Sequence, residues 1–247
     1  MYFEFFPYFS ISHVRLGVFM KQTLADTAYA YLLEKIYSSE LKSGDKISEQ
    51  TVIENLNISR TPVREAIRRM ASDGLIDFYP GTFARVHTFT SKEKLDMGAV
   101  RLAIDSLAAQ LAVLNGSNRD FQDLMAVAAK CQRASDEKDF MERIRLDCEF
   151  HAALSSISGN RELISIQQRL SMRSRLMQIQ AYNEKGSSSC DLAGHLDIIR
   201  ALMDRNVNAC LAAIQSHLRH FYTGDEEAKL EWNAIEPHVQ MSVFPLK

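Results

Sequence analysis

The segment SRTPVREAIRRM, residues 59 to 70, constrains the fold more than any other stretch because it combines two opposed faces in one helix. A helix has about 3.6 residues per turn, so residues four apart form one ridge. Three arginines have this spacing: Arg60, Arg64 and Arg68. Val63 and Ile67 fall on the opposite side and need a partner to pack against. The segment therefore predicts a helix that buries one face in a small core and exposes arginines on the other.

The surrounding sequence predicts what that core is made of. Apolar residues recur at three- and four-residue steps over residues 24–36, which indicates a first helix. EQTVIENL follows Ser48 as a possible N-cap and predicts a short second helix, and the third helix runs from Ser59 to Gly74. LIDFY and TFARVH, separated by Pro-Gly, predict two strands of a hairpin. Three helices followed by a hairpin predict a winged helix-turn-helix over residues 20–89.

The rest of the chain shows only helical periodicity. Thr90 and Glu93 have the spacing of a capping box, so a new helix should begin there. We expect helices at residues 92–115, 119–134, 137–157, 161–184, 192–203 and 206–222. The predicted fold class is mainly α, an N-terminal winged helix-turn-helix followed by an all-α bundle of six to seven helices over residues 90–223. Residues 224–247 form a weakly patterned tail. Residues 1–19 are predicted to be an upstream extension, with translation starting at Met20.

Composition excludes some function classes. Lys and Arg number 29 against 31 Asp and Glu, so the chain is not coated in basic surface and any nucleic-acid footprint must be local. Four cysteines are scattered without a CxxC pair, which predicts reduced thiols in a cytoplasmic protein. We find no window with the roughly 18 apolar residues of a membrane span, so no membrane partner is expected.

The arginine helix has the chemistry for reading a DNA duplex. The second helix of a helix-turn-helix enters the major groove with its N-terminal residues nearest the bases, and here that end carries Ser59, Arg60, Thr61 and Arg64. Arginine can fork onto guanine, and hydroxyls suit phosphates. A solvated face with a few ion pairs is the alternative. Residues 20–90 carry nine basic and nine acidic side chains, so one copy should bind modestly. We therefore expect a homodimer on two half-sites.

A second constellation suits a metal ion. Asp147 and His151 stand four apart on one helix face, and His195 and His217 lie singly on the last two helices. Neighbouring helices of a bundle can converge such groups on one ion. Three imidazoles and a carboxylate suit zinc or nickel, and also iron or manganese. From spacing alone, packed and hydrogen-bonded histidines remain the alternative, and His220 could replace His217.

The head sequence closely resembles a known family. LKSGDKISEQTVIENLNI, SRTPVREAIRRMASDGLI and YPGTFARV resemble the DNA-binding domain of GntR-family bacterial transcriptional regulators, and the helical remainder resembles the FadR-like subgroup with its C-terminal effector (FCD) domain. The resemblance covers about residues 21 to 223. It implies DNA contacts by Arg60, Thr61 and Arg64 on the recognition helix and by Gly81 in the wing. Gln50 stands where such proteins often have an arginine, and it could still hydrogen-bond adenine or a phosphate.

The same resemblance implies a sensor. Many FadR-like effector domains bind a divalent metal through an Asp, a His four later and one His from each of two later helices, which favours the metal site and zinc as its ion. A cation that accepts five or six ligands would keep a position open beside these four donors, for water or for a small carboxylate effector. Arg101 lies in the helix that resembles one lining this pocket; the alternative is a surface pair with Asp105. Asn160 is a candidate effector contact, with a helix cap as the favoured alternative.

The leading functional prediction is a metal-containing transcriptional regulator of double-stranded operator DNA, expected to be a repressor, whose affinity a small carboxylate controls. Two alternatives stay open. One is a metal-dependent hydrolase-type enzyme using the same residues, but Glu149, the nearest candidate base, points to a different helix face, and the sequence has neither HExxH nor a nucleophile elbow. We therefore do not expect an enzyme. The other alternative is a constitutive DNA-binding protein with a purely structural metal.

Overall fold

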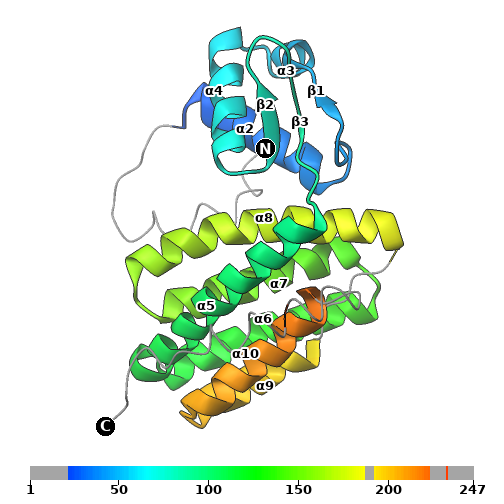
Figure 1. Ribbon diagram of the computed structural model, residues 1–247. Helices are drawn as coiled ribbons and strands as arrows, with labels where there is room; N and C mark the ends of the chain where they lie inside the picture. The colour runs from blue at the N-terminus through cyan, green and yellow to red at the C-terminus, as the bar shows by residue number, and fades with distance from the viewer. Residues whose placement is uncertain (1–21, 187–191, 223–231, 233–247) are drawn as a thin grey trace.

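The computed structural model describes residues 22–186, 192–222 and Trp232. A small N-terminal head, residues 22–89, lies on one side of a larger helical bundle, with α8 directly beneath the head (Figure 1). The head elements are α2 (Leu24–Tyr37), β1 (Lys46–Ile47), α3 (Glu49–Leu56), α4 (Arg60–Ser72), β2 (Ile76–Tyr79) and β3 (Phe83–Val86). The bundle elements are α5 (Ser91–Asn115), α6 (Asn118–Asp136), α7 (Phe140–Ile157), α8 (Arg161–Lys185), α9 (Leu192–Met203) and α10 (Val207–Tyr222).

The head is a helix-turn-helix with a three-stranded wing, which confirms the predicted fold. Its sheet has the order β1-β3-β2, and both neighbours run antiparallel to β3. The sequence predicted the β2–β3 hairpin but missed β1. This strand has only two residues, paired as Lys46 with Arg85 and Ile47 with Ala84, and so short a segment cannot show the alternation that marks a strand.

The core of the head explains why α4 presents its arginines outward. Its apolar residues are fully or almost fully buried and pack on α2, α3 and β2: Val63, Ala66, Ile67 and Met70. Burying four such side chains fixes the rotation of the helix about its own axis, because each contributes roughly 1 to 3 kcal/mol of transfer free energy. The opposite face, with Arg60, Arg64 and Arg68, is therefore left exposed.

The helix starts follow the predicted capping chemistry, with one exception. Thr90 and Glu93 form a complete capping box at the start of α5, and the Ser48 side chain accepts a hydrogen bond from the backbone of Thr51. Ser59 is the N-cap of α4 in an extended conformation, but its side chain makes no capping hydrogen bond. The hydroxyl at the start of the recognition helix is thus not committed to the helix itself.

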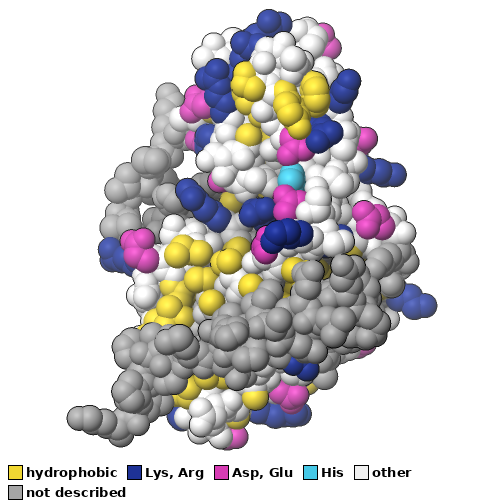
Figure 2. Space-filling model, in the orientation of Figure 1, with side chains coloured by type: hydrophobic (Ala, Val, Ile, Leu, Met, Phe, Trp, Pro, Cys, Tyr) yellow, Lys and Arg dark blue, Asp and Glu magenta, His cyan; other side chains and the backbone are white. Residues whose placement is uncertain are grey.

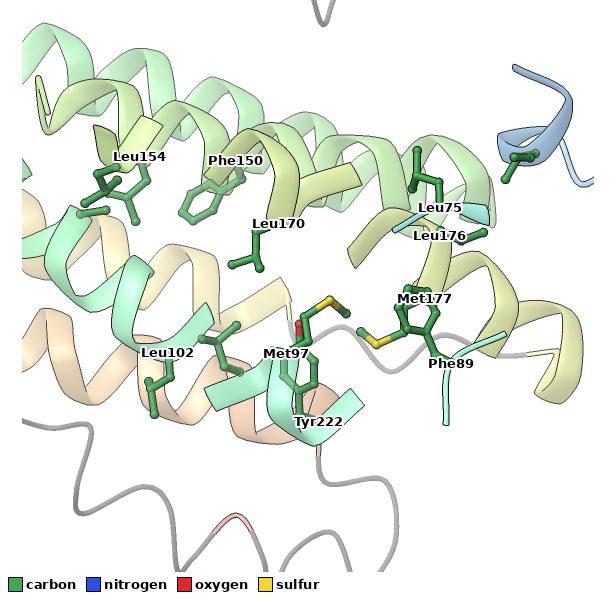
Figure 3. Packing of buried hydrophobic residues seen from close by; sticks show 14 of the residues in the cluster. Leu75, Phe89, Met97, Leu102, Phe150, Leu154, Leu170, Leu176, Met177 and Tyr222 are labelled. Atoms are coloured by element: carbon green, nitrogen blue, oxygen red, sulfur yellow. The ribbon is translucent and has the colours of Figure 1, made fainter. Parts of the chain in front are cut away.

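The bundle is all-α, as predicted, and six helices occur in its described residues. Helix α5 packs against α7, α8 and α10. Helix α6 packs against α7, and α7 packs against α8, so helices consecutive in the chain lie side by side. A continuous hydrophobic cluster joins the bundle to the head, and Figure 3 shows Leu75 and Phe89 lying beside Leu176 and Met177 of α8. The head and the bundle helices therefore share one core.

Helix α5 corrects one expectation about membrane spans. By length and composition it is apolar enough to cross a membrane, with a mean hydropathy of 1.5 over an 18-residue window. This window was not predicted, because Arg101 and Asp105 interrupt its apolar run. Both charged side chains are buried in the bundle, and half of the window is buried. The helix is a core helix of this fold.

Other expectations lie at or beyond the described parts of the chain. Cys131, Cys148 and Cys210 are buried free thiols, as predicted, and Cys190 is outside the described residues. The 1–19 extension is also outside them, as is the 224–247 tail apart from Trp232. Trp232 is buried and stacks in parallel on Tyr222 with ring centroids 5.9 Å apart.

Candidate nucleic-acid interface and metal centre

The predicted DNA-reading residues all lie on the exposed surface of the head. Arg60 and Arg64 keep 63% and 49% of their side-chain surface accessible, and Ser59 and Thr61 are exposed beside them at the start of α4. Figure 2 shows Lys and Arg side chains gathered at the far end of the head, away from the bundle. The residues are thus free to approach a duplex without rearrangement of the head core.

Gln50 and Gly81 lie on neighbouring elements of the same head. Gln50 is exposed on α3, where its amide donates to Glu54 at 2.7 Å. Gly81 is exposed in the turn between β2 and β3, and its φ of +78° is a conformation that glycine adopts without strain. The wing tip therefore needs glycine for its backbone shape, independently of any contact with DNA.

Glu49 was missed by the sequence analysis. Its carboxylate lies 3.1 Å from Nε of Arg64 and 4.0 Å from Nε of Arg60. Glu49 therefore connects α3 to α4 within the helix-turn-helix. Glu49 and Arg64 are 15 residues apart, so no local sequence pattern predicts their contact. In the free protein this ion pair holds the Arg64 guanidinium in place, and because it is exposed it is weak enough to exchange for DNA.

The four predicted metal ligands come together in the bundle. Asp147 and His151 lie on α7, His195 on α9 and His217 on α10, and one potential ligand atom from each lies within 4.8 Å of the others. All four residues are buried. Three different helices therefore bring one carboxylate and three imidazoles to a single point, as the sequence predicted.

The distances within this cluster suit one small cation. Asp147 Oδ1 lies 3.2 Å from His195 Nε2 and 3.9 Å from Nε2 of both His151 and His217. His151 Nε2 and His217 Nε2 are 3.2 Å apart. Ligands of tetrahedral zinc, at roughly 2.0 to 2.1 Å from the ion, are about 3.3 Å from one another. Neither ring nitrogen of His195 has a hydrogen-bond partner of good geometry, although burial without a partner is costly. The residues fit a divalent metal.

The electrostatics favour the ligand forms of these groups. Burial raises the pKa of Asp147, but the close contact with the His195 ring and the nearby His151 and Arg101 outweigh it and hold that pKa well below its usual range. Burial lowers the pKa of His195 and, more strongly, of His217, where neighbouring histidines add to the effect. An ionised carboxylate and neutral imidazoles are the forms that bind metals.

Further buried groups orient the ligands, and sequence reasoning missed two of them. Asp105 Oδ2 lies 2.9 Å from Nδ1 of His151, which leaves Nε2 of that ring facing the cluster. Gln178 Nε2 donates to Asp147 Oδ2 at 2.7 Å, which leaves Oδ1 facing the histidines. Such outer contacts commonly fix the ring orientation and basicity of metal ligands. No spacing rule could have found them, because they lie on α5 and α8, far away in sequence.

Of the two candidate effector contacts, Arg101 lies buried beside the ligand cluster, whereas Asn160 caps a helix. Arg101 does pair with Asp105 at 3.4 Å, but the pair is buried, so the alternative of a surface pair was wrong. Arg101 Nη2 also lies 3.7 Å from Asp147 Oδ2. Asn160 is exposed and caps α8 by accepting from the backbones of Glu162 and Leu163. The capping alternative describes its side chain, and its effector role has no support in these contacts.

Gly194 on α9 lies so close to His217 that a larger residue there would displace the His217 ring. A Cβ atom on this residue would lie 2.8 Å from Nδ1 and 2.9 Å from Cβ of His217. We expect Gly194→Ala to push the His217 ring away from the other ligands and to weaken Zn²⁺ binding at least tenfold. Alanine favours helix by up to about 1 kcal/mol over glycine, so α9 itself should not suffer. Isothermal titration with Zn²⁺ measures the change, and equal affinity in variant and wild type would contradict it.

The base that the hydrolase alternative would use does not face the cluster. Glu149, its candidate, pairs with Arg145 at 2.7 Å and is half-buried on another face of α7. With an exposed arginine helix on the head and a buried ligand cluster beneath it, the fold and the site define a DNA-binding regulator with a helical sensor domain.

Comparisons with known proteins agree with this class. Residues 24–86 match the family model of bacterial regulatory proteins of the gntR family, and residues 96–220 match the model of the FCD domain. The chain belongs to the GntR family of transcriptional regulators, in the FadR-like subgroup with an FCD domain. This is a family of transcriptional regulators and not of enzymes.

Individual relatives cover most of the chain. It is 29% identical to the Nta operon transcriptional regulator of Aminobacter aminovorans over 74% of this chain and 86% of that protein. It is 25% identical to the HTH-type transcriptional repressor RspR of Escherichia coli over 80% of this chain and 87% of that one. Among solved structures, E. coli McbR/YncC covers 87% of this chain and 98% of its own, with a TM-score of 0.68 at 19% identity, which shows a shared fold.

Proposed function

We propose that this regulator is a homodimeric repressor whose operator affinity is set by a small carboxylate bound at or near a divalent metal in the bundle. One observation carries the proposal: the same chain holds an exposed arginine helix and, in the bundle, a buried carboxylate and three imidazoles within 4.8 Å. The repressor sign is supported by the relative RspR, which is described as a repressor. The proposed action on operator DNA supports a cytoplasmic location.

On the DNA side, Arg60 and Arg64 are proposed to read bases in the major groove, with Ser59 and Thr61 on phosphates. Gln50 on α3 and Gly81 at the wing tip are proposed as flanking contacts. The uncommitted Ser59 hydroxyl and the free N–H groups of the first turn of α4 support a phosphate at this position. Residues 20–90 carry as many acidic as basic groups, so two heads on an inverted repeat are needed for useful affinity.

On the sensor side, Asp147, His151, His195 and His217 would hold the metal, and zinc suits this donor set best, with nickel, manganese and iron as alternatives. A bound ion would supply a positive charge, and an ion that accepts five or six ligands would keep a position for an anionic ligand beside the four protein donors. Arg101 supports a carboxylate there, because its Nε is buried without a hydrogen-bond partner and lies 3.4 Å from Asp105 Oδ2. This N–H group could donate to a carboxylate oxygen of the effector.

The proposed dimer has a candidate face on α5. Five apolar residues recur along one side of this helix and remain exposed or half-buried: Val100, Ile104, Leu107, Leu111 and Leu114. Val100 and Leu114 are 49% and 55% exposed, and Figure 2 shows hydrophobic side chains gathered on the bundle face where α5 and α8 lie. An apolar stripe of this kind, exposed at both ends and half-buried between them, is typical of an interaction surface, and an inverted repeat requires a second copy of this chain.

Charge on this stripe should separate the protomers. We expect the double change Val100→Lys and Leu114→Lys to convert dimers to monomers, because two buried ammonium groups per protomer would lose hydration without a partner. Sedimentation velocity at micromolar concentration measures the state. Met203→Lys, at a 42% exposed apolar residue on α9, is the matched control and should leave the dimer intact. A double variant that sediments as the wild type would contradict the α5 interface.

A thermal-shift screen tests the effector. Small organic acids are added to the zinc-loaded and to the metal-stripped protein, and acids that raise the melting temperature are then tested in DNA binding. The proposal predicts at least one acid that acts only on the loaded protein and lowers DNA affinity. Stabilisation by zinc with no acid altering DNA binding would instead support a constitutive protein with a structural metal.

A further inference from the structure

Helix α8 touches both the ligand cluster and the DNA-binding head. Residues 178 and 180 are two apart, so on a helix their side chains point in nearly opposite directions. Gln178 faces the cluster and Gln180 faces the head, and both are almost fully buried, at 1% and 3% exposure. Figure 1 shows α8 running between the head above it and the bundle below. The helix therefore links the two functional surfaces over a single turn.

At the end of this connection that faces the ligand cluster, Gln178 contacts Asp147 directly. Its Nε2 donates to Asp147 Oδ2 at 2.7 Å, while Asp147 Oδ1 faces the histidines. Gln178 Oε1 is buried without a hydrogen-bond partner, so it has an acceptor free for a group bound beside the carboxylate. Any shift of Asp147 that accompanies ligand binding acts directly on this buried amide.

At the output end, Gln180 holds the segment that connects wing and bundle. Its Nε2 donates to the backbone carbonyl of His87, and its Oε1 accepts from the backbone N–H of Phe89 at 3.3 Å. His87 Nδ1 in turn contacts Asp77 on β2 at 2.7 Å. The Gln180 amide therefore both donates to and accepts from the backbone that follows strand β3. Through His87 and its contact with Asp77 it is connected to strand β2 of the wing.

A second contact of α8 reaches the recognition helix. Tyr37 of α2 donates to the backbone carbonyl of Met172 at 3.0 Å, and the Arg175 guanidinium lies 4.2 Å from the centre of the Tyr37 ring. Tyr29 donates to Asp73, the C-cap of α4, at 2.8 Å and contacts the sulfur of Met172 at 3.5 Å. The position of α8 is therefore coupled to α2 and to the end of α4 as well as to the wing.

We propose that α8 is the element that transmits occupancy of the metal site to the DNA-binding head, with Gln178 as the sensing contact and Gln180 as the output contact. This rests on the proposed function, since it assumes that the cluster binds metal. Because α8 is one continuous helix packed in a shared core, a displacement at Gln178 moves Gln180 with it. The two side chains differ in what they touch, so their roles can be separated by substitution.

Hydrogen–deuterium exchange of the full chain with and without Zn²⁺ tests the relay. In the wild type, saturating Zn²⁺ should change exchange by at least twofold in peptides covering residues 83–90 and 24–37, far from the metal. Gln180→Ala should bind Zn²⁺ with wild-type affinity but lose this remote change. Gln178→Leu keeps all four donors and should bind Zn²⁺ somewhat more weakly, yet also lose the change at saturation. Gln168→Ala, at an exposed position of α8, is the matched control and should behave as the wild type.

The outcomes separate the relay from the metal proposal. Isothermal titration showing no Zn²⁺ binding by the wild type would overturn the metal site and the relay with it. Zn²⁺ binding without a change in exchange of the head would overturn the relay alone. A full remote response in both Gln178→Leu and Gln180→Ala, with Zn²⁺ bound, would also overturn the relay and leave the metal site standing.

Discussion

Replacing Arg64 by alanine is expected to remove sequence-specific DNA binding while leaving the fold intact. The side chain is 49% exposed and its partner in the free protein is the exposed Glu49, so little stability depends on it. A forked arginine–guanine contact contributes about 1 to 3 kcal/mol, which corresponds to roughly 5- to 150-fold in affinity at each half-site. A dimer loses the contact twice. Fluorescence anisotropy on a duplex enriched from a random-sequence pool by the wild-type protein measures the loss.

Arg119→Ala provides the control for net charge. Arg119 is 79% exposed on α6 and pairs with its neighbour Asp123 one turn further along the helix. Its removal changes the charge of the protein equally but should leave specific affinity within about twofold, since it is far from the head. If both variants lost affinity to the same extent, or if Arg64→Ala kept the wild-type footprint, base reading by Arg64 would be refuted.

Replacing His195 by alanine should abolish metal binding at physiological concentrations. Zinc bound by four protein ligands gains roughly 10 to 16 kcal/mol, so one ligand accounts for about 3 to 4 kcal/mol, or on the order of 100- to 1,000-fold in affinity. At a Zn²⁺ concentration 100 times the wild-type Kd, binding raises the free energy of unfolding of the wild type by about 2.7 kcal/mol. This stabilisation should be lost in the variant. Metal analysis and thermal unfolding with and without Zn²⁺ measure both effects.

His195 also packs on Phe150, with ring centroids 4.1 Å apart, so some loss of stability without metal is expected and circular dichroism must confirm folding. His87→Ala removes a histidine outside the cluster and should retain full metal occupancy. Full occupancy in folded His195→Ala would show that the ligand assignment is wrong.

Much of the fold could be predicted because its signals are local. The opposed faces of α4, the capping box of Thr90 and Glu93, and the Pro-Gly turn between two β-rich segments are patterns within a few residues of one another. The metal-ligand candidates were also accessible, because an Asp and a His four apart define one face of α7. The approach of His195 and His217 to that face was predicted from the family resemblance. Their own positions in the sequence do not show how α9 and α10 pack against α7.

The contacts that tune the site were beyond sequence reasoning. Asp105, Gln178 and Gly194 act on residues of other helices, and their effect depends on how α5, α8 and α9 cross α7 and α10. The burial of the Arg101–Asp105 pair could not be predicted for the same reason. A charged pair four apart on a helix reads as a solvated surface pair until packing shows that both partners are buried.

The central claim is that two copies of this chain read DNA through the start of α4. Selection of duplexes from a random-sequence pool by the full-length protein tests this most directly. Our account predicts enrichment of an inverted repeat with two half-sites about one helical turn apart, recovered by the wild type and not by Arg64→Ala. A folded, dimeric protein that enriches no motif, or the same motif with both chains, would contradict it.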